Sequence, residues 1–150
     1  MKQIVSIACV ALLVNAFAGC RKDNPKDANA SNSITGSWEL RKSSAAMNPN
    51  VHIFPPGNGN ILKFTDAGYQ LYINGQLVKT GVYAVVEDLT VESNVCLVLP
   101  AGEYTHRIVY DDNYTATKEF IQISGTKLSV ISGCYAIDAG HTLEYERQSR

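Results

Sequence analysis

The segment NILKFTDAGYQLYINGQLVKTGVYAV, residues Asn60–Val85, decides the predicted fold. Apolar and polar side chains alternate along most of it, which is the pattern of a strand with one buried face. Asp66 and Gly68 supply one turn. The pair Asn74-Gly75 is a strong hairpin signal, because both residues tolerate the positive φ angles of a type I′ turn. The stretch therefore predicts a meander of three antiparallel strands.

The rest of the chain after residue 33 carries similar short segments, and no window after the N-terminal 19 residues shows sustained helical spacing. Further strands are predicted in ITGSWELRKS (34–43), NVCLVLP (94–100), HRIVYDDN (106–113), TKEFIQISGTKLSVISG (117–133) and HTLEYERQ (141–148). Eight to ten short strands at this spacing predict an all-β domain. We expect a single antiparallel up-and-down barrel, with a β-sandwich as the alternative.

The opening strand carries a motif. Gly36 and Trp38 resemble the G-x-W of lipocalin-like barrels, in which the tryptophan plugs one barrel end and an arginine of the last strand packs across its ring. The resemblance implies that Arg147 lies over Trp38, through a cation–π contact of ~0.5–2 kcal/mol. It also implies that the first and last strands are neighbours.

An eight-stranded barrel is just wide enough either to fill with side chains or to hold one small ligand. The residues NPNVHIFPPGNGN (48–60) are expected to form the long first loop. Large apolar side chains are expected on the inward face at Leu62, Phe64, Leu71, Ile73, Phe120 and Leu143. They leave both a filled barrel and a ligand-holding barrel open.

The N-terminus has the features of a secretory signal. Lys2 is followed by the largely apolar run Ile4–Ala18, which is shorter than the ~20 apolar residues of a membrane span. The sequence FAGC at its end resembles a bacterial lipobox. The resemblance implies that residues 1–19 are removed and that Cys20 is lipidated, which anchors the protein without a transmembrane helix.

The resemblance to a lipobox implies a place in the cell envelope. The chain resembles the lipocalin-like lipoproteins of Bacteroidetes, and Arg21 after Cys20 favours the outer over the inner membrane under the sorting rule of proteobacterial lipoproteins. Residues 20–33 hold no large apolar side chain and predict a flexible tether. Residues 34–150 form the predicted domain. Losing residues 1–19 leaves a net charge of −2, which does not point to nucleic acid.

Two cysteines remain in the domain, Cys96 and Cys134, after Cys9 leaves with the signal and Cys20 takes lipid. In an oxidising compartment an even pair predicts a disulfide. It would close a loop of about 39 residues, which contributes ~4 kcal/mol in the chain-entropy model. The alternative is two buried free thiols.

No nucleophile, metalloprotease or phosphate-loop motif is present, so we expect no enzyme and no cofactor. The scattered His52, His106 and His141 do not predict a metal site. Asp111-Asp112-Asn113 lacks the loop of a calcium site and predicts a solvated turn. We expect the barrel to bind a small apolar or amphipathic ligand at residues the sequence does not specify. The alternative is a filled barrel whose loops bind an envelope protein or glycan.

Overall fold

The computed structural model of the chain describes residues 32–149. The predicted signal peptide, Cys20 and nearly all of the tether lie outside these residues. The described part is all-β, as predicted, apart from one α-helix and one 3-10 helix. Its elements are β1 (Gly36–Ala45), β2 (Asn48–Ile53), β3 (Ile61–Thr65), β4 (Gly68–Ile73), β5 (Gln76–Gly81), β6 (Tyr83–Glu87), α2 (Val91–Val95), β7 (His106–Tyr110), β8 (Glu119–Ser124), β9 (Lys127–Ser132), η1 (Tyr135–Ile137) and β10 (His141–Arg147).

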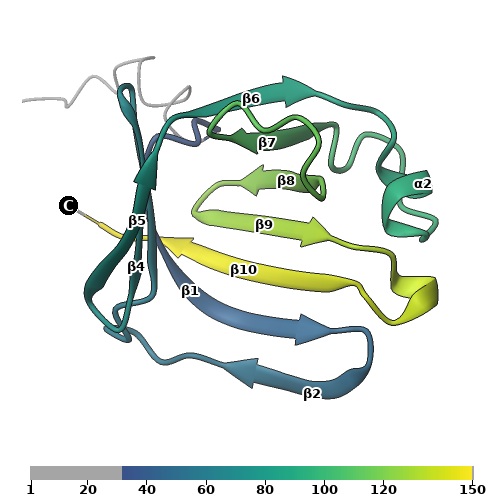
Figure 1. The fold of residues 1–150 in the computed structure, drawn as a ribbon. Helices are drawn as coiled ribbons and strands as arrows, with labels where there is room; N and C mark the ends of the chain where they lie inside the picture. The colour runs from purple at the N-terminus through teal and green to yellow at the C-terminus, as the bar shows by residue number, and fades with distance from the viewer. Residues whose placement is uncertain (1–31, 150) are drawn as a thin grey trace, which may run out of the picture.

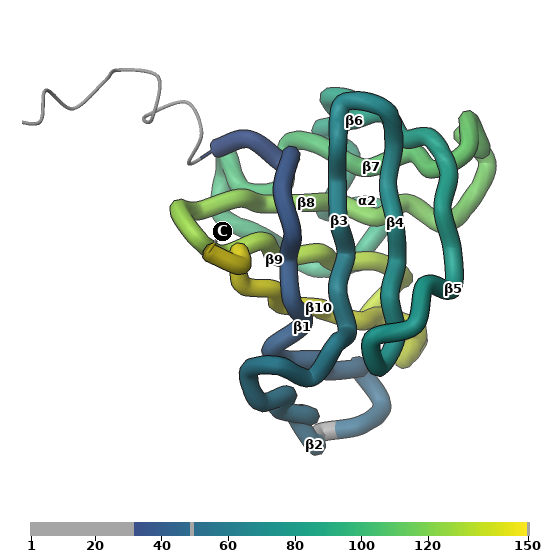
Figure 2. The backbone as a smooth tube through the Cα atoms, turned by 90° about the vertical axis from the view of Figure 1, so that its left-hand side faces the viewer, coloured from purple at the N-terminus to yellow at the C-terminus, as the bar shows by residue number. Residues whose placement is uncertain are grey.

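The strands form a nearly closed antiparallel barrel. Nine of them follow the order β5-β4-β3-β1-β10-β9-β8-β7-β6, and β2 pairs with β1 beside this path. The meander predicted from Asn60–Val85 is β3-β4-β5, with Asn74 and Gly75 at positive φ in its second turn. These strands cross in front of β8, β9 and β10 in Figure 2. Only Val82 separates β5 from β6, so one bent segment joins the two ends of the strand order (Figure 1).

The closed end of the barrel is built around Trp38, which is fully buried. Trp38 pairs with Arg147 across the β1–β10 ladder, and the Arg147 guanidinium carbon lies 4.0 Å from the indole centroid. Arg147 also donates hydrogen bonds to the carbonyl oxygens of Ser33 and Thr35. Gly36 has φ +139°, and a Cβ there would lie 2.7 Å from an Arg147 nitrogen. The contact predicted from the G-x-W resemblance is therefore present.

Two predictions about the chain's apolar segments are wrong. The segment NVCLVLP is not a strand, because it holds the end of α2 and the loop after it, with Cys96 in a left-handed conformation. Val91 and Val95, one helical turn apart, pack against Phe120 and Ile131 on the outer face of β8–β9. Phe120 therefore faces outward, toward α2, and not into the barrel. An outward phenylalanine is stable here because the helix covers it.

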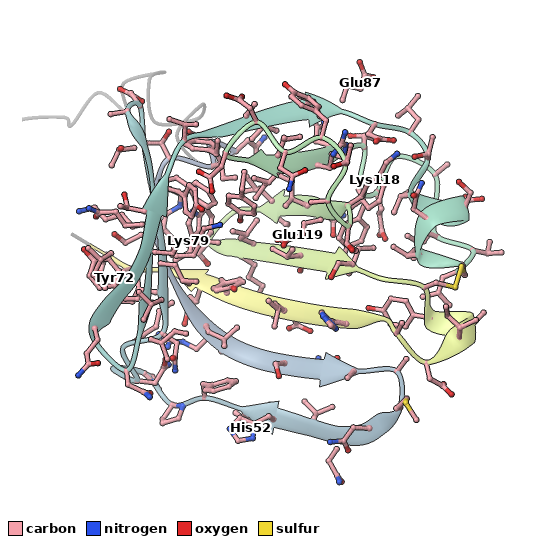
Figure 3. The ribbon with its side chains drawn as sticks, viewed as in Figure 1. His52, Tyr72, Lys79, Glu87, Lys118 and Glu119 are labelled. Atoms are coloured by element: carbon pink, nitrogen blue, oxygen red, sulfur yellow. A yellow bond between two sulfur atoms is a disulfide. The ribbon has the colours of Figure 1, made fainter. Side chains whose placement is uncertain are left out.

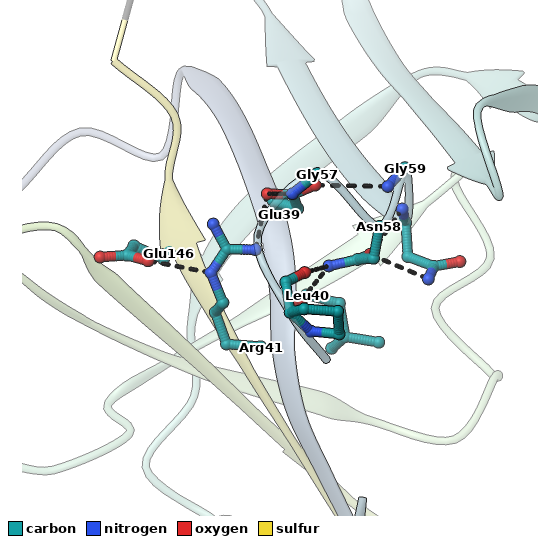
Figure 4. A network of polar contacts seen from close by, with 9 residues as sticks. Glu39, Leu40, Arg41, Gly57, Asn58, Gly59 and Glu146 are labelled. Atoms are coloured by element: carbon teal, nitrogen blue, oxygen red, sulfur yellow. Dashed lines mark hydrogen bonds and ion pairs between the residues drawn. The ribbon is translucent and has the colours of Figure 1, made fainter. Parts of the chain in front are cut away.

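The segment between β1 and β3 differs from the predicted long loop. Its first part is β2, which pairs with the second half of β1. The remainder is fixed by Glu39, a carboxylate only 2 % exposed that accepts hydrogen bonds from the backbone N–H groups of Gly57 and Gly59 and pairs with Arg41 (Figure 4). Burial alone would raise the pKa of Glu39, but these hydrogen bonds lower it below its usual value.

The segment from β6 to β7 is fastened to the barrel at two points. Near its start, Asp88 forms ion pairs with Arg107 (2.9 Å) and Lys118 (2.8 Å). After α2, a disulfide joins Cys96 to Cys134 in the β9–β10 connection, with their Cα atoms 5.0 Å apart. The predicted pairing is therefore confirmed, although Cys96 lies at a helix end and not within a strand.

Trp38→Ala is expected to lower the free energy of unfolding by about 3–5 kcal/mol, because it empties a buried site. Arg147→Ala should lower it by less. The double variant should lose less than the sum of the two, since residues in contact couple energetically. Urea unfolding of the four proteins measures this coupling, and strictly additive losses would contradict a closure contact between these side chains.

Cys96→Ala and Cys134→Ala should each lower the free energy of unfolding by about 2–5 kcal/mol, because either change releases the link between α2 and the β9–β10 connection. Intact-mass analysis after alkylation under denaturing, non-reducing conditions should show no label on either cysteine. Labelling of both positions in the mature protein would show that the bond does not form.

Candidate functional site

The candidate site is a hollow where β7 and β8 separate. These strands pair over only three residues each, His106–Ile108 with Glu119–Ile121, and residues 111–118 cross the gap beyond. The hollow has a volume of about 240 Å³. We name it the wedge; its lining residues are Lys79, Arg107, Ile108, Tyr110, Asp111, Asn113, Ala116, Thr117 and Glu119.

Asp111 organises one wall of the wedge. Its carboxylate pairs with Lys79 of β5 (3.1 Å) and accepts hydrogen bonds from the Tyr69 hydroxyl (3.0 Å) and the Val82 backbone N–H (3.2 Å). The contacts with Lys79 and Tyr69 lower the pKa of Asp111. The contacts of Lys79 with Tyr69 and Asp111 raise the pKa of Lys79. A Cβ at Gly81 would lie 1.9 Å from the Asp111 carboxylate, so this approach needs glycine. Asp111 thereby ties the β5–β6 bend to the end of β7.

Two tyrosines lie beneath this wall. The rings of Tyr69 and Tyr110 are 4.6 Å apart, and the Lys79 ammonium lies 5.5 Å and 6.0 Å from their centroids. Burial raises the pKa of Tyr110 far above its usual value, so its phenol is neutral at physiological pH. Of the two rings, that of Tyr110 lines the wedge. The wedge therefore combines an aromatic ring with charged groups, which suits a ligand with both apolar and polar parts.

Glu119 places a carboxyl group without an ion-pair partner in the described residues on the inward face of the wedge. It shares the inward face of β8 with Ile121 and Ile123, and it comes from the side of the barrel opposite Lys79 (Figure 3). Burial raises the pKa of Glu119, while the positive charge of Lys79 acts in the other direction. Within residues 32–149, neither an ion pair nor a hydrogen bond is formed by the Glu119 carboxyl group.

The other charges of the wedge already have partners. Lys79 is paired with Asp111, and Arg107 with Asp88, which also holds Lys118. Burial alone would raise the pKa of Asp88, but hydrogen bonds from Lys118 and Thr90 hold it well below its usual range. Glu119 is thus the wedge carboxylate that a ligand can pair with without breaking an existing ion pair.

Lys79, Tyr110 and Glu119 were not among the residues expected from the sequence to form a site. An inward Phe120 was expected, which would place Glu119 on the solvent side. In the structure Phe120 faces outward and Glu119 faces inward. Ile121 and Ile123 were the available signal, because their spacing puts Glu119 on their face. Ile73, expected inward, is 47 % exposed near the β4–β5 turn.

The predicted site residues fall into separate places. Gly36, Trp38 and Arg147 meet at the closed end, and Cys96 and Cys134 are bonded. The histidines stay apart, with the His52 ring 4.4 Å from that of Phe54. Across residues 32–149 no three potential metal ligands cluster. No helix in that range is long and apolar enough to cross a membrane.

No protein-family model, curated protein or solved structure matches the chain. The function of the protein is therefore inferred from its own residues and geometry.

Glu119→Gln is expected to stabilise the protein at pH 7. The folded-state pKa of Glu119 is raised, so folding disfavours its ionised form, and the amide removes that penalty. The gain should shrink as pH falls through the raised folded-state pKa, and it should vanish below the unfolded-state pKa, where Glu119 is protonated in both states. Thermal unfolding between pH 4 and 8 measures this, with the exposed Glu92→Gln as the control. A loss of stability at pH 7 would show that the carboxylate is well accommodated.

Proposed function

We propose that this chain is a lipid-anchored cell-envelope protein whose barrel binds a small amphipathic ligand in the wedge. The observation that carries the proposal is a hollow of about 240 Å³ in which the Tyr110 ring lies beside the Glu119 carboxyl group, which has no ion-pair partner in the described chain. No catalytic step, cofactor or nucleic acid enters the proposal.

The barrel core argues for a ligand at its margin and not at its centre. Trp38, Phe64 and Leu128 are at most 1 % exposed, and Tyr69 is 3 % exposed. These side chains fill the space between the crossed strands. The wedge is smaller than the roughly 300–1,000 Å³ of sites for drug-sized ligands, which limits the ligand to a few heavy atoms or to one end of a longer molecule.

Cys20→Ser is expected to move the protein from the membrane fraction to the soluble fraction of the cell envelope, because it removes the predicted acylation site. Detergent phase partitioning of whole-cell extracts measures this. A variant that still partitions with detergent would show that Cys20 is not the anchor.

Ala116→Trp should abolish ligand binding, because Ala116 lines the wedge and an indole there would fill much of it. The probes are n-butylammonium, n-butanol and butyrate, which have similar length and three different charges. Amide NMR shifts should report binding of at least one probe around Tyr110 and Glu119, with Ala101→Trp, on an exposed loop, as the control. If none of the probes shifts wedge amides, the ligand-binding proposal is wrong.

A second function is favoured by a different observation. Leu97, Val98 and Ile137 are 41 %, 92 % and 74 % exposed, in the two segments that the disulfide joins. Such residues suit a protein partner. Ala116→Trp separates the two functions, because it would leave a partner bound through these loops unaffected.

A further inference from the structure

From the geometry of the wedge, we infer that its ligand is a small organic amine, whose ammonium group pairs with Glu119 while its apolar part lies between Ile108, Tyr110 and Ala116. This inference rests on the proposed function and specifies the chemical class of its ligand.

The charges of the wedge favour a cationic ligand over an anionic one. An anionic ligand would need Lys79 or Arg107, but Asp111 and Asp88 already hold these cations at 3.1 Å and 2.9 Å. Binding an anion would therefore compete with existing ion pairs. The Glu119 carboxyl group has neither an ion pair nor a hydrogen bond within the described chain, so a cation binds there without displacing a side chain.

The surroundings of Glu119 also suit an ammonium group. The ring of Tyr110 lines the wedge with Glu119, and the Lys79 ammonium group lies 6.0 Å from its centroid. Aromatic faces attract cations, and the attraction grows as water is excluded. The partly buried Glu119 carboxylate adds to the binding of an ammonium group, because a charge-assisted hydrogen bond contributes more than a neutral one.

The size of the wedge limits which amines can enter. A hollow of about 240 Å³ admits an amine with a short apolar chain, or the amine end of a longer molecule. Ile108 and Ala116 supply apolar contacts, while Asn113 and Thr117 supply polar groups in the loop above. A quaternary ammonium ion cannot donate a hydrogen bond to Glu119, so primary amines should bind better.

The test is an NMR titration of the full chain carrying Cys20→Ser, with n-butylammonium, n-butanol and butyrate as probes. We expect butylammonium to bind most tightly, with shifts at Ile108, Tyr110 and Glu119. Glu119→Gln should weaken its binding by about tenfold or more, the range of one charged hydrogen bond. The same variant should leave butanol binding within about twofold, and Glu92→Gln should change neither.

The outcomes distinguish this inference from the proposed function. If butanol or butyrate binds the wedge at least as tightly as butylammonium, the amine class is wrong, but the wedge remains a ligand site. The amine class is equally wrong if butylammonium binding survives Glu119→Gln. If no probe binds the wedge, both proposals fail. Thermal unfolding of Glu119→Gln checks that the variant is folded.

Discussion

The packing of Arg147 over Trp38 is the constraint on which the rest of the barrel depends. It brings together the start of β1 and the end of β10. The first and last strands of the chain are therefore neighbours in the middle of the strand order. The same guanidinium holds the carbonyl groups of Ser33 and Thr35, which fixes where the chain enters the barrel. The indole fills the barrel interior at this end.

The bend between β5 and β6 is held by polar contacts of Asp111. Val82 is a single residue between two strands that belong to the two ends of the sheet order. Asp111 receives the Val82 N–H, the Tyr69 hydroxyl and the Lys79 ammonium, and the Asp111 N–H donates to the Val82 carbonyl at 2.9 Å. Because the end of β7 is held against this bend, β7 pairs with β8 over only three residues and then diverges from it. The wedge is a consequence of how the barrel closes.

The packing of α2 on the outer face of β8 explains why the wedge contains Glu119. Phe120 is covered by α2, which is held by the ion pairs of Asp88 and by the disulfide of Cys96. Since neighbouring strand residues point to opposite faces, an outward Phe120 requires an inward Glu119. A carboxyl group in such a place destabilises the folded state when it is ionised, and natural proteins retain such groups chiefly at functional sites.

The sequence by itself determined the all-β class, the meander of β3–β5, the strands at both ends, and the pairing of Cys96 with Cys134, while the contact of Trp38 with Arg147 was implied by the resemblance to G-x-W barrels. These features follow from local signals: alternation, the Asn74-Gly75 turn, a motif, and a count of cysteines in an inferred compartment. The lipid anchor at Cys20 remains a prediction.

Only the tertiary structure decided which residues of β8 face the barrel interior and which face α2, because both faces of that strand are covered. Alternation predicts the inside correctly only where the other side meets water. A five-residue helix over the outer face, too short for its periodicity to show in the sequence, changed the positions of Phe120 and Glu119. The wedge depends on residues from β5, β7 and β8 meeting in space, which no local pattern specifies.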